Sequence, residues 1–293
     1  MHWLQLSIDT TEAQAPLLEL IFENLGALSI TLGDAGDQPL LEPRPGEEHI
    51  WHDTRVTGLF PAERDADELR SALNQALNAD VTRSLHLERL ADRPWERVWL
   101  DDFHPMQFGR RLWICPDGQL PDAADAVVVE LDPGLAFGTG THPTTALCLE
   151  WLEQCDLRGK HLVDYGCGSG ILAIAALRLG AERAIAVDYD PQAIQATRDN
   201  ALKNQVAERL DTYLPDELPS LTADLLVANI LAEPLIELAP RLCRLLKIGA
   251  EFALSGILNE QLESVAGAYS ECGDLERPRI SDDWVLLSGR KSD

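Results

Sequence analysis

The chain has 293 residues, of which 45% are hydrophobic and 25% are charged, so it can fold as one large or two smaller globular domains. It carries 24 Lys and Arg residues against 49 Asp and Glu residues, and the formal net charge of −25 argues against broad, non-specific binding to nucleic acid. A surface of this sign would favour encounter with a basic partner, although the acidity would equally serve solubility alone.

The first 92 residues are predicted to form a small domain. Apolar and polar residues alternate over residues 4–8, as in a half-buried strand, and later apolar positions recur at helical spacing. The predicted strands are 4–8, 27–32, 50–60 and 81–90, and the predicted helices are 10–24 and 62–77. This β-α-β-β-α-β order is typical of a ferredoxin-like α+β module. Residues 93–110 are interpreted as a linker helix whose tryptophans pack at the domain junction.

Strands and helices alternate in the second predicted domain, residues 111–293. The expected strands are 112–115, 126–131, 161–165, 184–188, 225–230, 250–255 and 284–288. The expected helices are 144–155, 171–179, 191–204, 233–246 and 259–270. Because strands such as 225–228 are continuously apolar, they belong in a sheet that is buried on both faces. The predicted fold class is therefore α/β, a Rossmann-like doubly wound sheet joined to the small N-terminal domain.

The most informative motif is a glycine-rich turn between a predicted strand and a predicted helix. Gly166, Gly168 and Gly170 alternate with other residues, and Asp164 precedes them. Glycine suits such a turn because a Cβ atom would obstruct the tight backbone and an approaching ligand, while the next helix presents free N–H groups. The G-x-G-x-G spacing differs from both G-x-G-x-x-G and the P-loop. The turn predicts a nucleotide-type site at the carboxyl end of the strand.

Asp188 ends the next predicted strand. A carboxylate at this place, about 20 residues beyond the glycines, can accept hydrogen bonds from both hydroxyls of a ribose. The alternative is that Asp188 caps the following helix, but Asp190 is better placed for that role, directly before Pro191. Asp188 is therefore predicted to bind a ribose.

These features together resemble the Rossmann-like methyltransferases that use S-adenosylmethionine. Four further segments sharpen the match, namely residues 103–106, 112–116, 131–145 and 227–235. With them, the chain is similar from end to end to the family of bacterial ribosomal protein L11 methyltransferases. The resemblance implies an N-terminal domain that recognises a basic protein of the large ribosomal subunit and a second domain that binds S-adenosylmethionine. It also implies methylation of lysine side-chain and N-terminal α-amines, up to three times each.

Asn229 and Ile230 are the expected centre of this chemistry. Asn229 lies at the carboxyl end of a predicted strand, where a doubly wound sheet binds ligands. Its side-chain oxygen would accept a hydrogen bond from the substrate amine, and the carbonyl of Ile230 would accept another. In the relatives an asparagine at the matching position binds the cofactor, so Asn229 is assigned to both roles. The alternative is a turn asparagine that bonds its own backbone.

The segment 131–145 contributes three more expected site residues. Phe137, which lies near glycines, is predicted to close over the reacting methyl group or the substrate, or else to anchor the loop in the core. The resemblance makes Thr145 a cofactor contact, with a helix cap as the alternative. His142 is a candidate proton acceptor because histidine titrates near neutral pH, although proton loss directly to water would serve equally.

Three other functions stay open from the residues alone. A related methyltransferase could act on RNA or on a small-molecule amine, but the residues after Asn229 lack the aromatic of an N-P-P-[YF] motif and the net charge disfavours RNA. The intact cofactor turn argues against a non-catalytic adenosyl sensor. The glycine spacing argues against a nicotinamide-dependent oxidoreductase.

The apolar runs and the cysteines predict the environment of the chain. No apolar run approaches the roughly 18 residues that a membrane helix requires, and the first residues lack the pattern of a secretory signal. The six cysteines include no C-x-x-C pair and are expected to be free thiols. We therefore expect a cytoplasmic monomer with no metal, no membrane partner and no requirement for nucleic acid.

Overall fold

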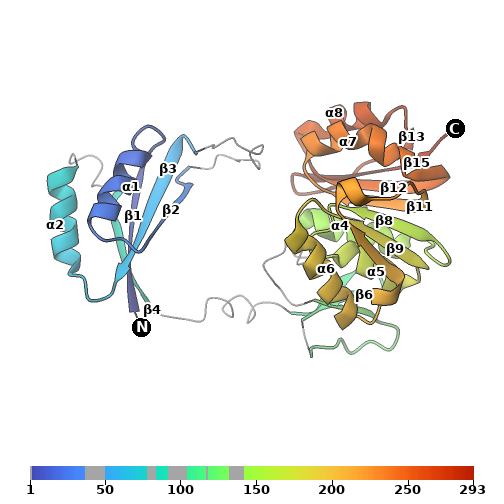
Figure 1. The fold of residues 1–293 in the computed structure, drawn as a ribbon, viewed down its shortest axis with the longest axis horizontal. Helices are drawn as coiled ribbons and strands as arrows, with labels where there is room; N and C mark the ends of the chain where they lie inside the picture. The colour runs from blue at the N-terminus through green and yellow to red at the C-terminus, as the bar shows by residue number, and fades with distance from the viewer. Residues whose placement is uncertain (1, 37–49, 78–83, 92–103, 117, 132–141) are drawn as a thin grey trace. The chain divides into compact units, whose positions relative to one another are not determined.

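The computed structural model describes residues 2–36, 50–77, 84–91, 104–116, 118–131 and 142–293 (Figure 1). The chain divides into two compact units, Met1–Trp99 and Leu100–Asp293. Of the predicted linker helix at 93–110, residues 93–103 lie outside the described residues, whereas Met106–Phe108 form a strand of the second unit. In the part of the chain that the structure describes, no helix combines the length and the apolar character needed to cross a membrane.

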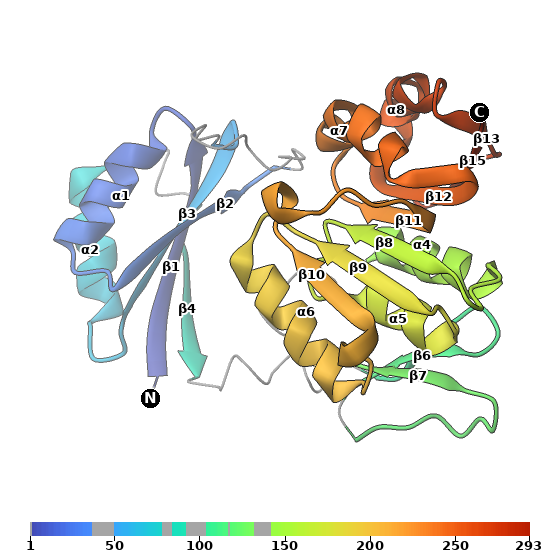
Figure 2. The same ribbon diagram turned by 45° about the vertical axis from the view of Figure 1, so that its right-hand side comes forward.

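The N-terminal unit is a four-stranded antiparallel sheet with two helices on one face. Its elements are β1 (His2–Thr11), α1 (Ala15–Asn24), β2 (Ser29–Asp34), β3 (Asp53–Pro61), α2 (Ala66–Ala76) and β4 (His86–Ala91). The strands pair in the order β2-β3-β1-β4, and Figure 2 shows both helices on the same side of the sheet. The order of the elements and their pairing confirm the predicted ferredoxin-like module.

The core of this unit explains the alternation along its strands. Leu4, Leu6 and Ile8 of β1 are fully buried and belong to one apolar cluster with residues of both helices. Phe22 of α1 packs edge-to-face on Phe60 of β3, with 6.0 Å between the ring centroids. Because successive side chains of a strand point to opposite faces, the residues between these buried positions line the face opposite α1 and α2.

The second unit contains an eight-stranded sheet. Its strands are β8 (His161–Tyr165), β9 (Arg183–Val187), β10 (Leu210–Tyr213), β11 (Ala223–Asn229), β12 (Leu246–Leu258), β13 (Gly273–Leu275), β14 (Arg279–Ser281) and β15 (Trp284–Lys291). They lie in the order β10-β9-β8-β11-β12-β15-β13, and β14 pairs with β15. The strands from β10 to β12 run parallel, whereas β15 is antiparallel to β12. The sheet confirms the predicted Rossmann-like class, but β10, β13 and β14 were not predicted.

Helices pack on both faces of this sheet. The α-helices are α4 (Pro143–Gln154), α5 (Ile171–Leu179), α6 (Pro191–Lys203), α7 (Ala232–Arg244) and α8 (Leu262–Tyr269), and the 3-10 turns are η2 (Ala207–Arg209), η3 (Pro215–Glu217) and η4 (Asn259–Gln261). One buried apolar cluster contains residues of α4, α5 and α6, and a second contains residues of α7 and α8. Two such clusters, one on each face, are what a doubly wound sheet requires.

A small third sheet packs against the first of these clusters. It consists of β5 (Met106–Phe108), β6 (Leu112–Cys115) and β7 (Val127–Glu130), with β5 antiparallel and β7 parallel to β6. Asn204 at the end of α6 fixes its edge, because its side chain donates to the carbonyl of Glu130 over 2.7 Å and accepts from the N–H of Glu130 over 2.8 Å. These two hydrogen bonds therefore join the small sheet to the end of α6.

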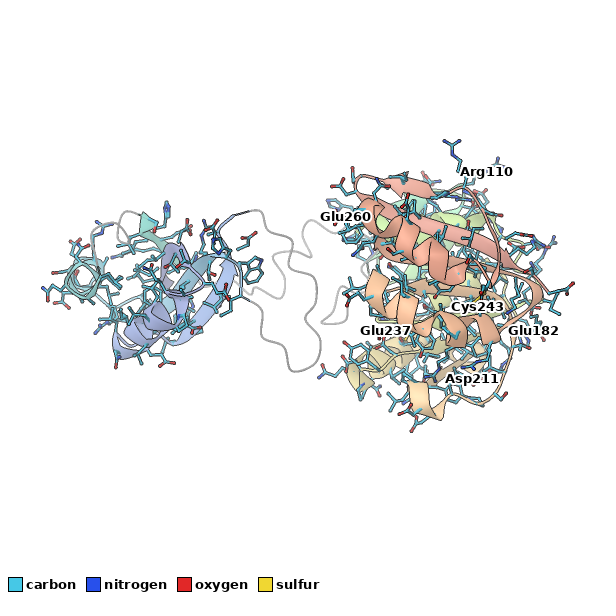
Figure 3. The ribbon with its side chains drawn as sticks, turned by 90° about the horizontal axis from the view of Figure 1, so that it is seen from above. Arg110, Glu182, Asp211, Glu237, Cys243 and Glu260 are labelled. Carbon is cyan, nitrogen blue, oxygen red and sulfur yellow. A yellow bond between two sulfur atoms is a disulfide. The ribbon has the colours of Figure 1, made fainter. Side chains whose placement is uncertain are left out.

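Two cysteines form a disulfide, which corrects the expectation that all six are free. Cys243 near the end of α7, labelled in Figure 3, is bonded to Cys272 after α8, with 5.7 Å between the Cα atoms. The other four, Cys115, Cys148, Cys155 and Cys167, are free. The pair lies 29 residues apart in no recognisable motif, and only the folding of α7 and α8 into one cluster brings the two thiols together.

Candidate active site

The predicted site residues converge where the order of the strands reverses. The chain runs from β8 outward through β9 to β10 on one side, and from β11 to β12 on the other. β8 and β11 are therefore neighbours whose connections lead in opposite directions, as Figure 2 shows. Ligands of open α/β sheets bind in the crevice that forms beyond the carboxyl ends of two such strands.

The glycine-rich turn forms the β8 side of this crevice. Gly166, Gly168 and Gly170 all have positive φ angles, of 80°, 54° and 77°. The N–H groups of Gly166 and Cys167 donate to the carbonyl of Val187 over 2.7 and 3.1 Å. A Cβ atom at Gly166 would lie 2.2 Å from Ile230 Cγ2, so the turn requires glycine for both its conformation and its packing.

Two side chains of α6 donate hydrogen bonds to backbone carbonyls of the turn, and neither residue was predicted from the sequence. Thr197 donates its hydroxyl to the carbonyl of Gly168 over 3.0 Å, and Asn200 donates its amide to the carbonyl of Ser169 over 2.8 Å. Thr197 is fully buried, and a Cβ atom at Gly170 would lie 2.7 Å from its Cγ2. Polar residues on the inward face of a predicted helix were the only available signal for them.

Asp188 lies directly after β9, and its carboxylate hydrogen-bonds to the backbone of the glycine-rich turn. One oxygen accepts from the N–H of Gly168 over 2.9 Å, and the other accepts from the N–H of Asp190 over 3.0 Å. The N-cap of α6 is Asp190, whose side chain accepts from the N–H of Gln192 over 2.8 Å. Asp188 is therefore not the helix cap, and its oxygens keep lone pairs that can accept further hydrogen bonds.

Asp164 is a second carboxyl group beneath the turn. Its side chain is fully buried, Oδ2 accepts from the N–H of Ala173 over 3.0 Å, and Oδ1 has no hydrogen-bond partner among the described residues. The pKa of this carboxyl is raised to about 7, because burial, helped by the nearby charge of Asp188, outweighs the lowering effect of the hydrogen bond from Ala173. The carboxyl group therefore changes its charge near neutral pH.

Asn229 and Thr145 form the β11 side of the crevice. Asn229 is the last residue of β11, and its Nδ2 donates to the hydroxyl of Thr145 over 3.2 Å. Thr145 is buried in the first turn of α4, but the N-cap of that helix is His142. Because the nitrogen of the Asn229 amide is the donor in this contact, its oxygen is the group left to accept a hydrogen bond.

His142 is held in place by its role as a helix cap. Nδ1 accepts from the N–H of Thr144 over 3.3 Å and lies 2.7 Å from its hydroxyl oxygen. The imidazole also stands edge-on to Trp284, with 4.9 Å between the ring centroids. Burial lowers the pKa of His142, which favours the neutral ring. A neutral ring that accepts at Nδ1 carries its proton on Nε2, so taking up a second proton would break the cap.

The crevice thus brings together most of the predicted site residues. The turn and Asp188 lie at the ends of β8 and β9. Asn229 ends β11 and contacts Thr145 of α4, and Ile230 follows it. Phe137 lies outside the described residues. Among the residues that are described, no group of His, Cys, Asp and Glu side chains is arranged to hold a metal ion.

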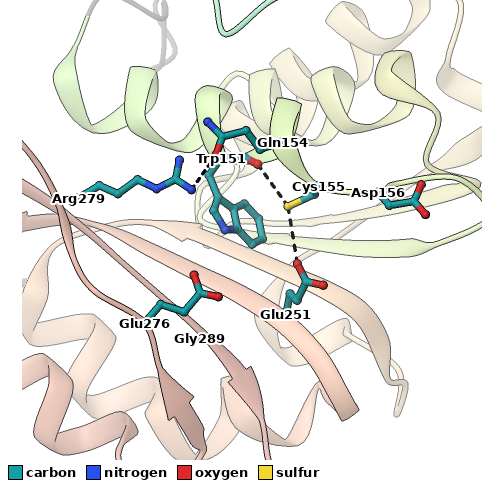
Figure 4. Close-up of a pocket in the computed structure, with 8 residues that line it drawn as sticks. All are labelled: Trp151, Gln154, Cys155, Asp156, Glu251, Glu276, Arg279 and Gly289. Atoms are coloured by element: carbon teal, nitrogen blue, oxygen red, sulfur yellow. Dashed lines mark hydrogen bonds between the residues drawn. The ribbon is translucent and has the colours of Figure 1, made fainter.

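A separate hollow of about 320 Å³ lies at the other end of α4 (Figure 4). It is lined by residues such as Trp151, Cys155 and Glu251, and its charged groups are already paired: Arg279 donates to Gln154 over 2.8 Å. Glu251 accepts from Arg290 over 3.0 Å. Cys155 lies ten residues after Thr145, or about 15 Å along a helix, so this hollow is no part of the crevice.

Several known proteins similar to this chain are described as methyltransferases or methylases of ribosomal protein L11. Over residues 2–292 the chain matches the family model described as ribosomal protein L11 methyltransferase (PrmA). The ribosomal protein L11 methyltransferase of Hahella chejuensis is 52% identical over 99% of both chains, and that of Serratia proteamaculans is 52% identical over 99% of this chain and 100% of its own. A solved structure, the ribosomal protein L11 methylase from Lactobacillus delbrueckii subsp. bulgaricus, is 32% identical with a TM-score of 0.57, covering 65% of this chain and 99% of that one.

Proposed function

The chain belongs to the ribosomal protein L11 methyltransferase family, and from this premise we propose that it moves methyl groups from S-adenosylmethionine to lysine side-chain and N-terminal α-amines of ribosomal protein L11. The observation that supports the proposal is that a possible cofactor-binding group and a possible amine-binding group lie on opposite sides of one crevice. A glycine turn with a carboxylate lies on one side, and an asparagine amide at the end of the neighbouring strand lies on the other.

The residues on the β8 side fit S-adenosylmethionine. We assign Asp188 to the ribose hydroxyls, because both of its oxygens are fixed and retain lone pairs. The positive φ angles of Gly166, Gly168 and Gly170 form the tight turn against which the cofactor would lie, and the buried Oδ1 of Asp164 still has hydrogen-bonding capacity. When bound, S-adenosylmethionine supplies an electrophilic methyl group. The proposed cofactor contacts also include Thr145, Asn229 and Phe137. The role of Phe137 is proposed from the sequence alone.

The residues on the β11 side are suited to hold an amine lightly. A lysine, with a pKa of about 10.4, or an α-amine, with a pKa of about 8, must be neutral to react. Asn229 Oδ1 accepts one N–H of the neutral amine, and the carbonyl of Ile230 accepts the second. A neutral primary amine has only these two N–H groups and loses one with each methyl group, so the second transfer proceeds with one of these hydrogen bonds and the third with neither.

The proton that leaves the amine after transfer needs an acceptor. The sequence offered His142 and water as equal candidates. The hydrogen bond from Thr144 to Nδ1 and the lowered pKa favour water, because His142 would have to release its helix cap to take the proton. We therefore assign His142 to positioning the start of α4, and with it Thr145.

We propose that the N-terminal domain, residues 1–92, recognises the protein substrate. The face of its sheet opposite α1 and α2 carries a hollow of about 470 Å³, lined by apolar side chains such as Trp3, Leu59 and Leu90 with the hydroxyl group of Thr57 among them. A net charge of −25 would attract a basic ribosomal protein and repel RNA. The net charge also supports our proposal that the protein acts without nucleic acid, and we propose from the sequence alone that it is a cytoplasmic monomer.

Acceptor choice tests this proposal directly. The full-length protein and methyl-labelled S-adenosylmethionine are incubated in separate reactions with fractionated large-subunit ribosomal proteins, with ribosomal RNA and with a small-molecule amine. Label in one small basic protein that co-migrates with L11 is the expected result. Label in the RNA, or only in a small-molecule amine, would keep the cofactor site and overturn the substrate.

A further inference from the structure

Ile230 is enclosed by two glycines from different strands. Gly166, with a φ of 80°, lies against its side chain, because a Cβ atom there would be 2.2 Å from Ile230 Cγ2. Gly256 of β12, with a φ of 85°, lies against its backbone, because a Cβ atom there would be 2.2 Å from the carbonyl oxygen and 2.7 Å from the carbonyl carbon. The side chain of Ile230 therefore touches the cofactor turn, while its carbonyl rests on β12.

A bulge in β12 brings Gly256 to this place. The pairing of β12 with β15 shifts register between Leu254 and Ile257, so Ser255 and Gly256 lie in the irregular stretch. Ser255 remains paired with Asn229 of β11, and its carbonyl accepts from the N–H of Ile230 over 3.1 Å. Its hydroxyl donates to the carbonyl of Val285 over 3.1 Å, which holds the bulge from the other side. Bulges of this kind re-aim groups beside active sites.

This packing fixes the direction of the Ile230 carbonyl. The Cα–H bond that replaces a side chain at Gly256 faces the carbonyl oxygen, which is the geometry of a weak C–H···O contact. A carbonyl oxygen has two lone pairs, so one remains for another donor. We propose that Gly256 is a positioning residue for methyl transfer. It orients the carbonyl of Ile230 so that a lone pair of the carbonyl oxygen accepts an N–H of the substrate amine. This inference rests on the proposed function, because it needs an amine as the acceptor.

The number of N–H groups on the substrate provides the test. A neutral primary amine has two N–H groups, whereas a neutral dimethylated amine has none and cannot bond to the Ile230 carbonyl. Single-turnover methylation is therefore measured with unmodified L11 and with L11 whose amines have been dimethylated by reductive alkylation. We expect Gly256→Ala to slow transfer to the unmodified protein about tenfold, the worth of one hydrogen bond, and to slow transfer to the dimethylated protein less than twofold.

Gly249 offers a matched control for backbone strain. It lies in the same strand with a φ of 78°, and a Cβ atom there would meet nothing within 4 Å. Gly249→Ala should lower the melting temperature as a left-handed alanine does, and leave both transfer rates unchanged. If Gly256→Ala does not fold, Ile230→Gly loosens the same carbonyl without a clash, and it should show the same selective loss for unmodified L11.

A second control separates the two glycines. Ile230→Ala should rescue Gly166→Ala, whose clash is with the Ile230 side chain, but not Gly256→Ala, whose clash is with the Ile230 backbone. Equal slowing on unmodified and dimethylated L11, by Gly256→Ala or by Ile230→Gly, would overturn the positioning role and leave the proposed function intact. No transfer to either form of L11 by the unaltered protein would overturn the proposed function itself.

Discussion

The two sides of the crevice are built in different ways. On the cofactor side, Asp188 accepts a hydrogen bond from the backbone of the glycine turn, and Thr197 and Asn200 donate to two of its carbonyls. On the acceptor side, one side-chain hydrogen bond joins Asn229 to Thr145, and close packing rather than hydrogen bonding surrounds the carbonyl of Ile230. The comparison indicates that one side is fixed for an unchanging ligand, whereas the other keeps acceptors free for an amine whose N–H count changes.

Removing residues 1–92 should have the largest effect, and it should fall on the acceptor side alone. Transfer to L11 should be abolished because the proposed recognition surface is lost, while the affinity for S-adenosylmethionine should stay within a few-fold, since the cofactor residues all lie in Leu100–Asp293. Calorimetric binding and methyl transfer measured on the same preparation test this. Full transfer by the truncated protein would refute the role of the N-terminal domain.

Asp188→Ala should have the next largest effect, on the cofactor side. It removes the proposed ribose contacts and releases the N–H groups of Gly168 and Asp190. The loss should be about 1.5–3 kcal/mol, or roughly ten- to 150-fold in the dissociation constant for S-adenosylmethionine. Asp190→Ala, which removes only the cap of α6, is the matched control and should change that constant much less. Equal weakening by both variants would assign the effect to α6 instead.

Asp164→Asn should change the dependence of stability on pH. The folded pKa of about 7 lies above the unfolded value of 3.8, so the folded protein retains a proton between these values that the unfolded chain loses. Stability therefore falls as pH rises through this window, by up to about 1.4 kcal/mol per pH unit. The variant should gain melting temperature over the unaltered protein at pH 8 and little at pH 4. The same difference at both values would contradict an ionising Asp164.

His142→Asn should have the smallest effect, because asparagine also caps helices well. If His142 only caps α4, transfer at pH 8 should stay within about threefold, whereas loss of a general base typically costs 10²–10⁴-fold. His142→Ala removes the cap as well, and should lower stability by about 1 kcal/mol. A hundredfold loss of transfer in His142→Asn, with normal stability, would restore His142 as the proton acceptor.

The sequence predicted the cofactor side better than the acceptor side, for a physical reason. The bounds of β8 and α5 were predicted to the residue, because an apolar strand and an apolar helix flank the three closely spaced glycines. The contact between Asn229 and Thr145 joins residues 84 positions apart, and depends on how α4 packs on the sheet. Local patterns carry information about turns and caps, but not about such a pairing.

The features that sequence analysis missed share this dependence on packing. β10, β13 and β14 have four, three and three residues, too few to show an alternating pattern. The bulge at Gly256 is visible only through the register of β12 against β15. Cys243 and Cys272 meet because α7 and α8 share a cluster, which no spacing between the two cysteines reveals.

Asn229 is proposed to contact the cofactor and to accept a hydrogen bond from the amine, and one variant tests most directly whether methyl transfer depends on it more than cofactor binding does. Asn229→Ala is assayed for the dissociation constant of S-adenosylmethionine and for single-turnover methylation of L11. Thr145→Val is the control, because it loses the same hydrogen bond and leaves the Asn229 carboxamide oxygen in place. We predict that Asn229→Ala binds within about fivefold of the unaltered protein and transfers about a hundredfold more slowly, a loss of about 2.7 kcal/mol in the transition state. Loss of binding in proportion to loss of transfer would contradict the account and make Asn229 a cofactor ligand alone.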